Sequence, residues 1–163
     1  NTVGDKFNSK EFFLPQVIMS AEASQKAFAH IKPMIKKEKN CVLGKVVMAT
    51  VKGDVHDIGK NIVCAVLESF GFEVFDLGKN IDHETIVEKA KQYDADIIGL
   101  SALMTTTMTE MENIIELKKS LNMDVKIMIG GAPVTKEFAC SIGADGYSKD
   151  AIEAARVAKA LLE

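Results

Sequence analysis

The stretch that decides the fold is Val46–Asn61, which reads VVMATVKGDVHDIGKN. Its first part, Val46–Val51, is a short apolar run rich in β-branched side chains, and this pattern predicts a buried strand. A polar loop follows, and apolar residues then recur at helical spacing over Ile58–Phe70, until Gly71 ends the run. A strand, a loop and a helix in this order are the first unit of an α/β protein.

The same unit recurs along the rest of the chain. Further strands are predicted at residues 72–77, 96–100, 125–129 and 144–147, and further helices at 82–93, 108–121, 134–141 and 150–162, with Asp82 placed to cap the first of these. Because crossovers between parallel strands are right-handed, these units predict a five-stranded parallel, doubly wound α/β sheet of the flavodoxin-like or Rossmann-like kind. Ligands of such sheets bind beyond the carboxyl ends of the strands, so we expect a site in the loops after strands one, three, four and five.

Residues 1–40 have a different pattern. Pro15 suits the first turn of a helix, apolar residues recur at helical spacing from Val17 to Phe28, and Pro33 bends or ends the run. We therefore expect a helical part over residues 1–40 and the α/β domain over residues 41–163. The chain begins at Asn1 with no starting methionine, so we expect the helical part to be truncated.

The composition narrows the choice of partners and location. The 163 residues are 47% hydrophobic and carry a formal net charge of −3, with no basic stripe that would bind nucleic acid. The sequence has no signal peptide and no apolar run long enough to span a bilayer, which favours a cytoplasmic protein. Cys41, Cys64 and Cys140 are scattered and odd in number, which favours reduced thiols buried as small hydrophobic residues.

The loop after the first strand carries a candidate metal ligand, His56. A neutral imidazole binds transition metals when its other ring nitrogen is held by an acceptor, and Asp54 is placed to supply a carboxylate for this. Two alternatives stay open from the residues alone: Asp54 or Asp57 caps the helix that begins near Ile58, and His56 is a solvated loop residue.

Three other kinds of site fit this loop poorly. A zinc site lacks further ligands, since His30 and His83 fall on distant helical stretches. A phosphate-binding loop would need one residue fewer between Gly53 and Gly59, and a serine or threonine instead of Asn61. A response-regulator receiver has the same sheet order, but it would need a phosphoacceptor aspartate after the third strand, where Ser101 stands.

Two further loops contain residues that suit a bulky ligand. Residues 101–107 are rich in hydroxyl groups and poor in charge, and Gly130-Gly131-Ala132-Pro133 leaves an opening for a flat group at the sheet edge. Each loop also has an ordinary interpretation, the first as a turn that caps the helix from Met108 and the second as a left-handed glycine turn.

Together, the three loops form a more specific pattern: Asp54-x-His56-x-x-Gly59, then Ser101-x-Leu103, then Gly130-Gly131. This pattern and its spacing resemble those of cobalamin-binding proteins that bind the cofactor with its own base displaced. Residues 53–63 are similar to cobalamin-dependent methionine synthase, and residues 4–7 and 13–17 resemble the helical cap before its cobalamin domain. In length, the chain resembles the small corrinoid proteins of methyltransferase systems.

The resemblance implies roles for the residues of these loops. His56 would replace the displaced base on cobalt, and Asp54 would hold its other ring nitrogen. Thr107 stands where methionine synthase has a serine that completes this relay, so the hydroxyl is kept while the added methyl group alters the geometry. The implied contacts with the corrinoid and its nucleotide tail are Gly53, Val55, Asp57, Ile58, Gly59, Ser101, Leu103, Thr105, Gly130, Gly131, Ala132, Asp150 and Ala151.

The resemblance also implies that residues 1–40 are a partial helical cap. Phe7, Leu14 and Val17 would cover the upper, methyl-bearing face of the corrin, although by spacing alone they are ordinary helix core.

The implied function is that of a non-catalytic carrier of a methyl group on the cobalt of cobalamin, which would occur in methylated, Co(I) and Co(II) forms. The implied partners are a substrate:corrinoid methyltransferase, a corrinoid:tetrahydrofolate or other acceptor methyltransferase, and a reductive activator. The alternative is an adenosylcobalamin-binding subunit of a mutase or a cobalamin-based sensor, because such mutases share the loop around His56 and adenosylcobalamin photoreceptors also carry a helical cap.

Overall fold

The computed structural model describes residues 6, 9–31 and 42–163. The chain divides into two compact units, Asn1–Lys36 and Lys37–Glu163. The first unit contains helix α2 (Leu14–Ile31), with Pro15 in its first turn as the sequence predicts. The domain boundary that we expect near residue 40 lies outside the described residues, as does Pro33.

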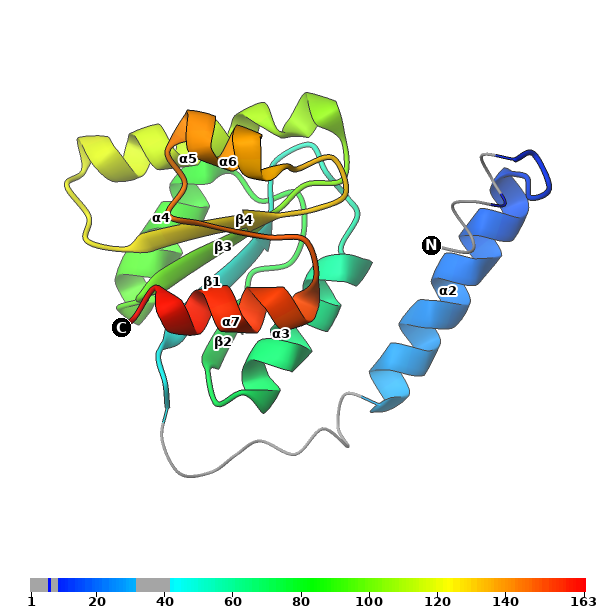
Figure 1. The fold of residues 1–163 in the computed structure, drawn as a ribbon, viewed down its shortest axis with the longest axis horizontal. Helices are drawn as coiled ribbons and strands as arrows, with labels where there is room; N and C mark the ends of the chain where they lie inside the picture. Colours follow the sequence, from blue (N-terminus) through cyan, green and yellow to red (C-terminus); the bar gives the residue numbers. More distant parts are fainter. Residues whose placement is uncertain (1–5, 7–8, 32–41) are drawn as a thin grey trace. The chain divides into compact units, whose positions relative to one another are not determined.

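The second unit is built on a parallel sheet with the strand order β2-β1-β3-β4-β5 (Figure 1). Its strands are β1 (Lys45–Thr50), β2 (Glu73–Asp76), β3 (Ile97–Ser101), β4 (Lys126–Gly130) and β5 (Gly146–Ser148). Its helices are α3 (Ile58–Ser69), α4 (His83–Tyr93), the 3-10 turn η2 (Thr105–Thr107), α5 (Thr109–Ser120), α6 (Lys136–Ile142) and α7 (Ala151–Ala160). The predicted doubly wound fold is confirmed, and the ends of its strands and main helices differ from the predicted ranges by at most two residues. None of the helices in the described ranges is both long and apolar enough to cross a membrane.

Helices cover both faces of this sheet, α3 and α7 on one side and α4, α5 and α6 on the other (Figure 1). The side chains of β1 alternate between the two faces, as the two-residue period of a strand requires. Val46 and Met48 share a buried cluster with Leu67 of α3. Val47 shares the opposite cluster with Ile86 of α4. Because the middle of the sheet is buried on both sides, the central strands β1, β3 and β4 contain continuous apolar runs.

The expectation for the cysteines holds only in part. Cys64 is buried in the sheet–α3 cluster, but Cys140 on α6 is exposed, so the prediction of a buried Cys140 is wrong. The reason is helical geometry: Ala139 faces the sheet, and the next side chain along a helix points away by about 100°. Cys41 lies outside the described residues.

The carboxyl ends of four strands lie in register along one edge of the sheet. Thr50 pairs with Ser101, Ser101 pairs with Gly130, and Gly130 pairs with Ser148. The topological switch point lies at β1, because the chain continues from β1 to β2 on one side and β3 lies on the other side. The loops after β1 and β3 therefore leave the sheet next to each other, where doubly wound proteins bind their ligands.

The sheet core makes a direct prediction for stability. Ile98 of β3 is fully buried, whereas the side chain of Ile62 on α3 lies at the surface, with the residue 41% exposed. We expect Ile98→Ala to lower the free energy of unfolding by about 2–5 kcal/mol, because the cavity cannot fully collapse. The matched change Ile62→Ala should cost less than about 1 kcal/mol. Urea unfolding of the corrinoid-free protein measures both, and equal losses would contradict the assignment of β3 to the core.

Candidate functional site

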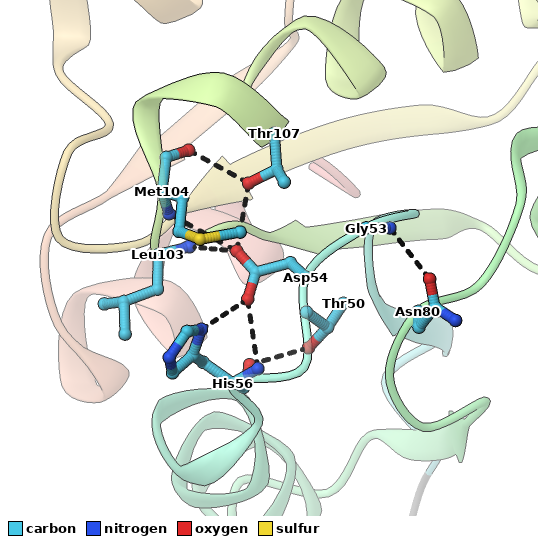
Figure 2. A network of polar contacts seen from close by, with 8 residues as sticks. All are labelled: Thr50, Gly53, Asp54, His56, Asn80, Leu103, Met104 and Thr107. Carbon is cyan, nitrogen blue, oxygen red and sulfur yellow. Dashed lines mark hydrogen bonds and ion pairs between the residues drawn. The ribbon is translucent and has the colours of Figure 1, made fainter.

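The loop after β1 folds back on itself and sets the candidate site. The Asp54 N–H donates to the Val51 carbonyl at 3.1 Å, and the Thr50 hydroxyl donates to the His56 carbonyl at 3.2 Å. Gly53 sits in the turn with a φ of 80°, which a residue with a Cβ atom rarely adopts. This turn directs Asp54 inward and His56 outward (Figure 2).

The carboxylate of Asp54 is fully buried and lies at the centre of a polar network (Figure 2). Its Oδ1 atom accepts from the His56 N–H at 3.0 Å and contacts His56 Nδ1 at 2.7 Å. Its Oδ2 atom accepts from the N–H groups of Leu103 at 2.7 Å and Met104 at 3.3 Å. The Thr107 hydroxyl is the remaining donor, at 3.0 Å from Oδ2. The network therefore joins the loop after β1 to the segment after β3.

These contacts control the protonation of Asp54. Burial alone would raise the pKa of this carboxyl, but the hydrogen bonds from Leu103, His56 and Thr107 outweigh it and lower the pKa to about 2. Asp54 is therefore ionised at neutral pH. It does not cap α3, and Asp57, which occupies the N-cap position of that helix, makes no side-chain capping bond either.

The geometry of His56 follows from this ionised partner. Because a carboxylate only accepts hydrogen bonds, the neutral ring must carry its proton on Nδ1, and the lone pair is left on Nε2. The His56 side chain is 48% exposed, whereas that of Asp54 is 0% exposed. The ring is therefore held by Asp54 through Nδ1, and Nε2 offers its lone pair on the other side of the ring.

Thr107 reaches Asp54 despite the methyl group that distinguishes it from a serine. Thr107 is buried in η2, and its hydroxyl oxygen lies 3.0 Å from Asp54 Oδ2 and 2.9 Å from the Met104 carbonyl oxygen. A hydroxyl has one proton, and the bond to the ionised carboxylate is the stronger of the two. The methyl carbon is turned toward Gly53, 3.5 Å from where a Cβ atom of that residue would lie.

The glycines of the three loops have different roles. A Cβ atom on Gly131, which has a φ of 134°, would lie 1.9 Å from the Ala102 carbonyl oxygen, and one on Gly130 would lie 2.9 Å from that of Ser148. Both glycines thus allow neighbouring backbones to approach closely. A Cβ atom on Gly59 would have no neighbour within 4 Å, so this glycine faces open space at the start of α3.

The other predicted site residues of the second unit lie along the same sheet edge. Ser101 and Gly130 pair at the strand ends, and Val55, Leu103, Thr105, Gly131 and Ala132 are exposed. Ile58 begins α3. Asp150 caps α7 by accepting from the Glu153 N–H at 2.8 Å. With Ala151, Asp150 lines a separate hollow of about 440 Å³.

Phe7 lies outside the described residues, and Leu14 and Val17 belong to α2 in the other unit.

Three contributors to the site could not be found from side-chain patterns. The N–H groups of Leu103 and Met104 bind Asp54 through the backbone, which leaves no signature in the residue type. Asn80, in the loop after β2, accepts from the Gly53 N–H at 2.8 Å. Its only sequence signal is that asparagine follows Gly78-Lys79 in a turn-like stretch.

Comparisons with known proteins show the family of this chain. Residues 44–156 match a family described as B12 binding domain, and residues 1–32 match a second family with the same description. The dimethylamine corrinoid protein of Methanosarcina barkeri is 47% identical over 165 residues, covering 99% of this chain and 78% of that protein. The solved monomethylamine corrinoid protein of the same organism is 36% identical with a TM-score of 0.90, covering 98% of this chain and 77% of that one. The methanol:cobalamin methyltransferase complex MtaBC, also from Methanosarcina barkeri, contains a chain that is 30% identical with a TM-score of 0.71, covering 98% of this chain and 62% of that one.

The chain belongs to the B12-binding domain family, whose members bind cobalamin. Within that family it belongs with the corrinoid proteins of methyltransferase systems, to which it is similar over almost its whole length. The resemblance carried by the three loops is thereby confirmed, and so is the corrinoid as cofactor.

The residues present fit this cofactor. His56 has the chemistry of a ligand for a transition metal, because its ring is half exposed and its Nδ1 is held by Asp54, so that Nε2 would be free to bind cobalt. In the described ranges, no group of three or more His, Cys, Asp or Glu side chains is placed to hold a bare metal ion. The exposed side chains of Val55 and Leu103 flank the loop with apolar surface that suits a large macrocycle.

The lowered pKa of Asp54 predicts a specific acid sensitivity. A carboxyl whose pKa falls from 3.8 to about 2 on folding contributes stability that is full above pH 5 and is lost as the pH falls toward 2. The contribution is about 2 kcal/mol. We therefore expect Asp54→Asn to destabilise the corrinoid-free protein by at least about 2 kcal/mol at pH 7, with the difference from wild type shrinking by about that amount between pH 5 and pH 2.

Urea unfolding at several pH values measures this difference. Asp124→Asn is the matched control, because Asp124 is exposed and precedes β4 at the opposite edge of the sheet. A gap between wild type and Asp54→Asn that stays constant over this pH range would show that folding does not lower the pKa of Asp54.

Proposed function

We propose that this chain binds cobalamin with the cofactor's own base displaced, with His56 Nε2 as the protein ligand of cobalt. The observation that carries the proposal is the half-exposed imidazole whose Nδ1 is held by a buried, ionised carboxylate (Figure 2). A carboxylate partner orients such a ring and raises the basicity of the outer nitrogen, which is what a metal ligand requires.

When bound, the corrinoid supplies a cobalt centre that accepts a methyl group and gives it up again. The chain's own part would be to offer His56 Nε2 as the protein ligand of that cobalt. While His56 Nε2 is engaged, the ring proton stays on Nδ1 and is shared with Asp54. Asp54, whose pKa is lowered to about 2, would stay ionised at neutral pH and keep the His56 ring oriented through Nδ1. Thr107 supports this by donating to the second carboxylate oxygen.

The remaining predicted residues receive roles in the same proposal. Ser101, Thr105 and the backbone of residues 130–132 would bind the nucleotide tail at the carboxyl edge of β3 and β4, with Asp150 and Ala151 at its far end. Residues 1–40 would form the cap, with Phe7, Leu14 and Val17 over the methyl-bearing face. The match of residues 1–32 to a B12 binding domain supports the assignment of this part of the chain to the same function.

The methyl group would pass between separate proteins. Relatives are named for dimethylamine and monomethylamine, and one solved relative is part of a methanol:cobalamin methyltransferase complex. We propose a methylated amine as donor, a substrate-specific methyltransferase as the delivering partner, a second methyltransferase that serves tetrahydrofolate or another acceptor, and a reductive activator. A cytoplasmic location is part of the proposal, and the exposed thiol of Cys140 is compatible with the reducing conditions there.

The ligand role of His56 is tested by spectroscopy. Wild type and His56→Gln are each reconstituted with hydroxocobalamin, and their absorbance spectra are compared. We expect the spectrum of cobalt ligated by the protein in wild type and its loss in His56→Gln. His83→Ala is the matched control, since His83 is also partly exposed, 29% by side chain, and begins α4. Binding of cobalamin by wild type with its own base still on cobalt would refute the proposal.

The carrier role is tested with candidate donors. The Co(I) form of the reconstituted protein is mixed with mono-, di- or trimethylamine and with methanol, each with its methyltransferase, and methylation is followed by absorbance. We expect at least one methylamine system to act at least about tenfold faster than methanol, because a partner interface that fits poorly by 1.4 kcal/mol already costs this factor. Inactivity with every donor, together with tight binding of adenosylcobalamin, would favour a mutase subunit or a sensor.

A further inference from the structure

The loop after β2 runs beside the loop that carries His56. The Thr50 N–H donates to the Gly78 carbonyl at 3.0 Å, and the Ile81 N–H donates to the Thr50 carbonyl at 3.2 Å. Val51 and Ile81 form an isolated parallel bridge. The residues that lead into the His56 loop are therefore paired with the chain on the β2 side as well as with β3.

Asn80 extends this pairing to the residues next to His56. Its side-chain Oδ1 accepts from the Gly53 N–H at 2.8 Å (Figure 2), and its own N–H donates to the Asp54 carbonyl at 3.0 Å. The two bonds hold the two peptide units that flank the Gly53–Asp54 peptide, namely Lys52–Gly53 and Asp54–Val55. Asn80 has a φ of 55°, a left-handed conformation that is unfavourable for a residue with a Cβ atom and is best tolerated by asparagine and aspartate.

A second contact from the same segment holds the other end of the loop. Lys60, four positions after His56 on α3, has a fully buried side chain and forms an ion pair with Asp76 at the end of β2. Its ammonium also donates to Asn61 Oδ1 at 2.9 Å, and Asp76 Oδ1 accepts from the Gly78 N–H at 2.8 Å. A lysine in the first turn of a helix opposes the helix dipole, so this buried pair is not explained by helix stability. Residues 76–80 therefore bind the chain on both sides of His56: Asn80 contacts Gly53 and Asp54 before it, and Asp76 contacts Lys60 after it.

We propose that Asn80 is a positioning residue for the axial ligand, acting through the backbone of Gly53 and Asp54. The inference rests on the proposed role of His56 as the donor to cobalt. The backbone position of Asp54 sets the direction of its carboxylate, the carboxylate fixes Nδ1 of His56, and the ring then aims Nε2. Loss of the Asn80 side-chain acceptor leaves the N–H of Gly53 without this partner, at a glycine whose φ of 80° has no Cβ atom to restrict it.

Three variants separate this role from general stability. Asn80→Gly removes the side-chain acceptor but keeps both the left-handed backbone and the N–H that binds Asp54. Asn80→Asp keeps an acceptor at the same place and is the conservative rescue. Asn122→Gly is the matched control, because Asn122 is an exposed asparagine with a φ of 51° that follows α5 at the opposite edge of the sheet.

The readout distinguishes a protein nitrogen on cobalt from the cofactor's own base. Protein labelled with ¹⁵N is loaded with unlabelled hydroxocobalamin and reduced to the Co(II) state, whose electron paramagnetic resonance lines split into doublets for a ¹⁵N ligand and triplets for a ¹⁴N ligand. We expect doublets in wild type, Asn80→Asp and Asn122→Gly. In Asn80→Gly the ratio of protein-ligated to unligated cobalt should fall by roughly three- to tenfold, the effect of one hydrogen bond.

A second readout needs no cofactor. Amide hydrogen exchange at Gly53 should be faster by roughly three- to tenfold in Asn80→Gly than in Asn122→Gly. An unchanged ligation ratio in Asn80→Gly, with doublets in wild type, would overturn the role of Asn80 while leaving His56 as the ligand. Triplets in wild type would instead overturn the assignment of His56, and the positioning role with it.

Discussion

One buried charge holds the two central loops of the sheet together. Asp54 belongs to the loop after β1, yet its Oδ2 atom binds donors that all come from the segment after β3. An ionised carboxylate without such donors would be several kcal/mol less stable in this place, so the loops can separate only at that cost. The strand order is what makes the arrangement possible, because β1 and β3 are neighbours and their ends are in register. The same carboxylate also sets the direction of the His56 ring, because Asp54 Oδ1 accepts the hydrogen bond from Nδ1.

The site has a buried, closely packed part beneath the His56 loop and an exposed apolar surface above it. Beneath the loop, Thr107 is buried, and Gly131 lies against the Ala102 carbonyl so closely that no side chain could replace its hydrogen. Above it, Val55 and Leu103 are 58% and 45% exposed, and nothing would meet a Cβ atom on Gly59. A site for a large planar ligand needs both parts. Polar groups must be held in place by packing and hydrogen bonds, and an apolar face must be wide enough for a ring to cover.

Hydrophobic periodicity sufficed to place the strands and helices, because burial on both faces of a parallel sheet leaves long apolar runs that side-chain order reveals. Asp82 was likewise predictable, and its carboxylate accepts from the Thr85 N–H at 3.3 Å. The predicted partnership of Asp54 with His56 is present in the structure, although the role of either residue toward cobalt is still a proposal. What could not be predicted depends on atoms that residue types do not encode: backbone donors at Leu103 and Met104, the left-handed turn at Asn80, and the rotation that exposes Cys140. These features arise only when distant segments meet.

The location of the network along the chain has a further consequence. In the part of the chain that the structure describes, the donors and braces that fix Asp54 and His56 lie between Thr50 and Thr107, within the second compact unit. The polar contacts around Asp54 and His56 are thus completed within a single compact unit. A substitution in the other unit, Asn1–Lys36, removes none of these hydrogen-bond partners, so the geometry of the Asp54–His56 pair does not depend on the identity of the residues there.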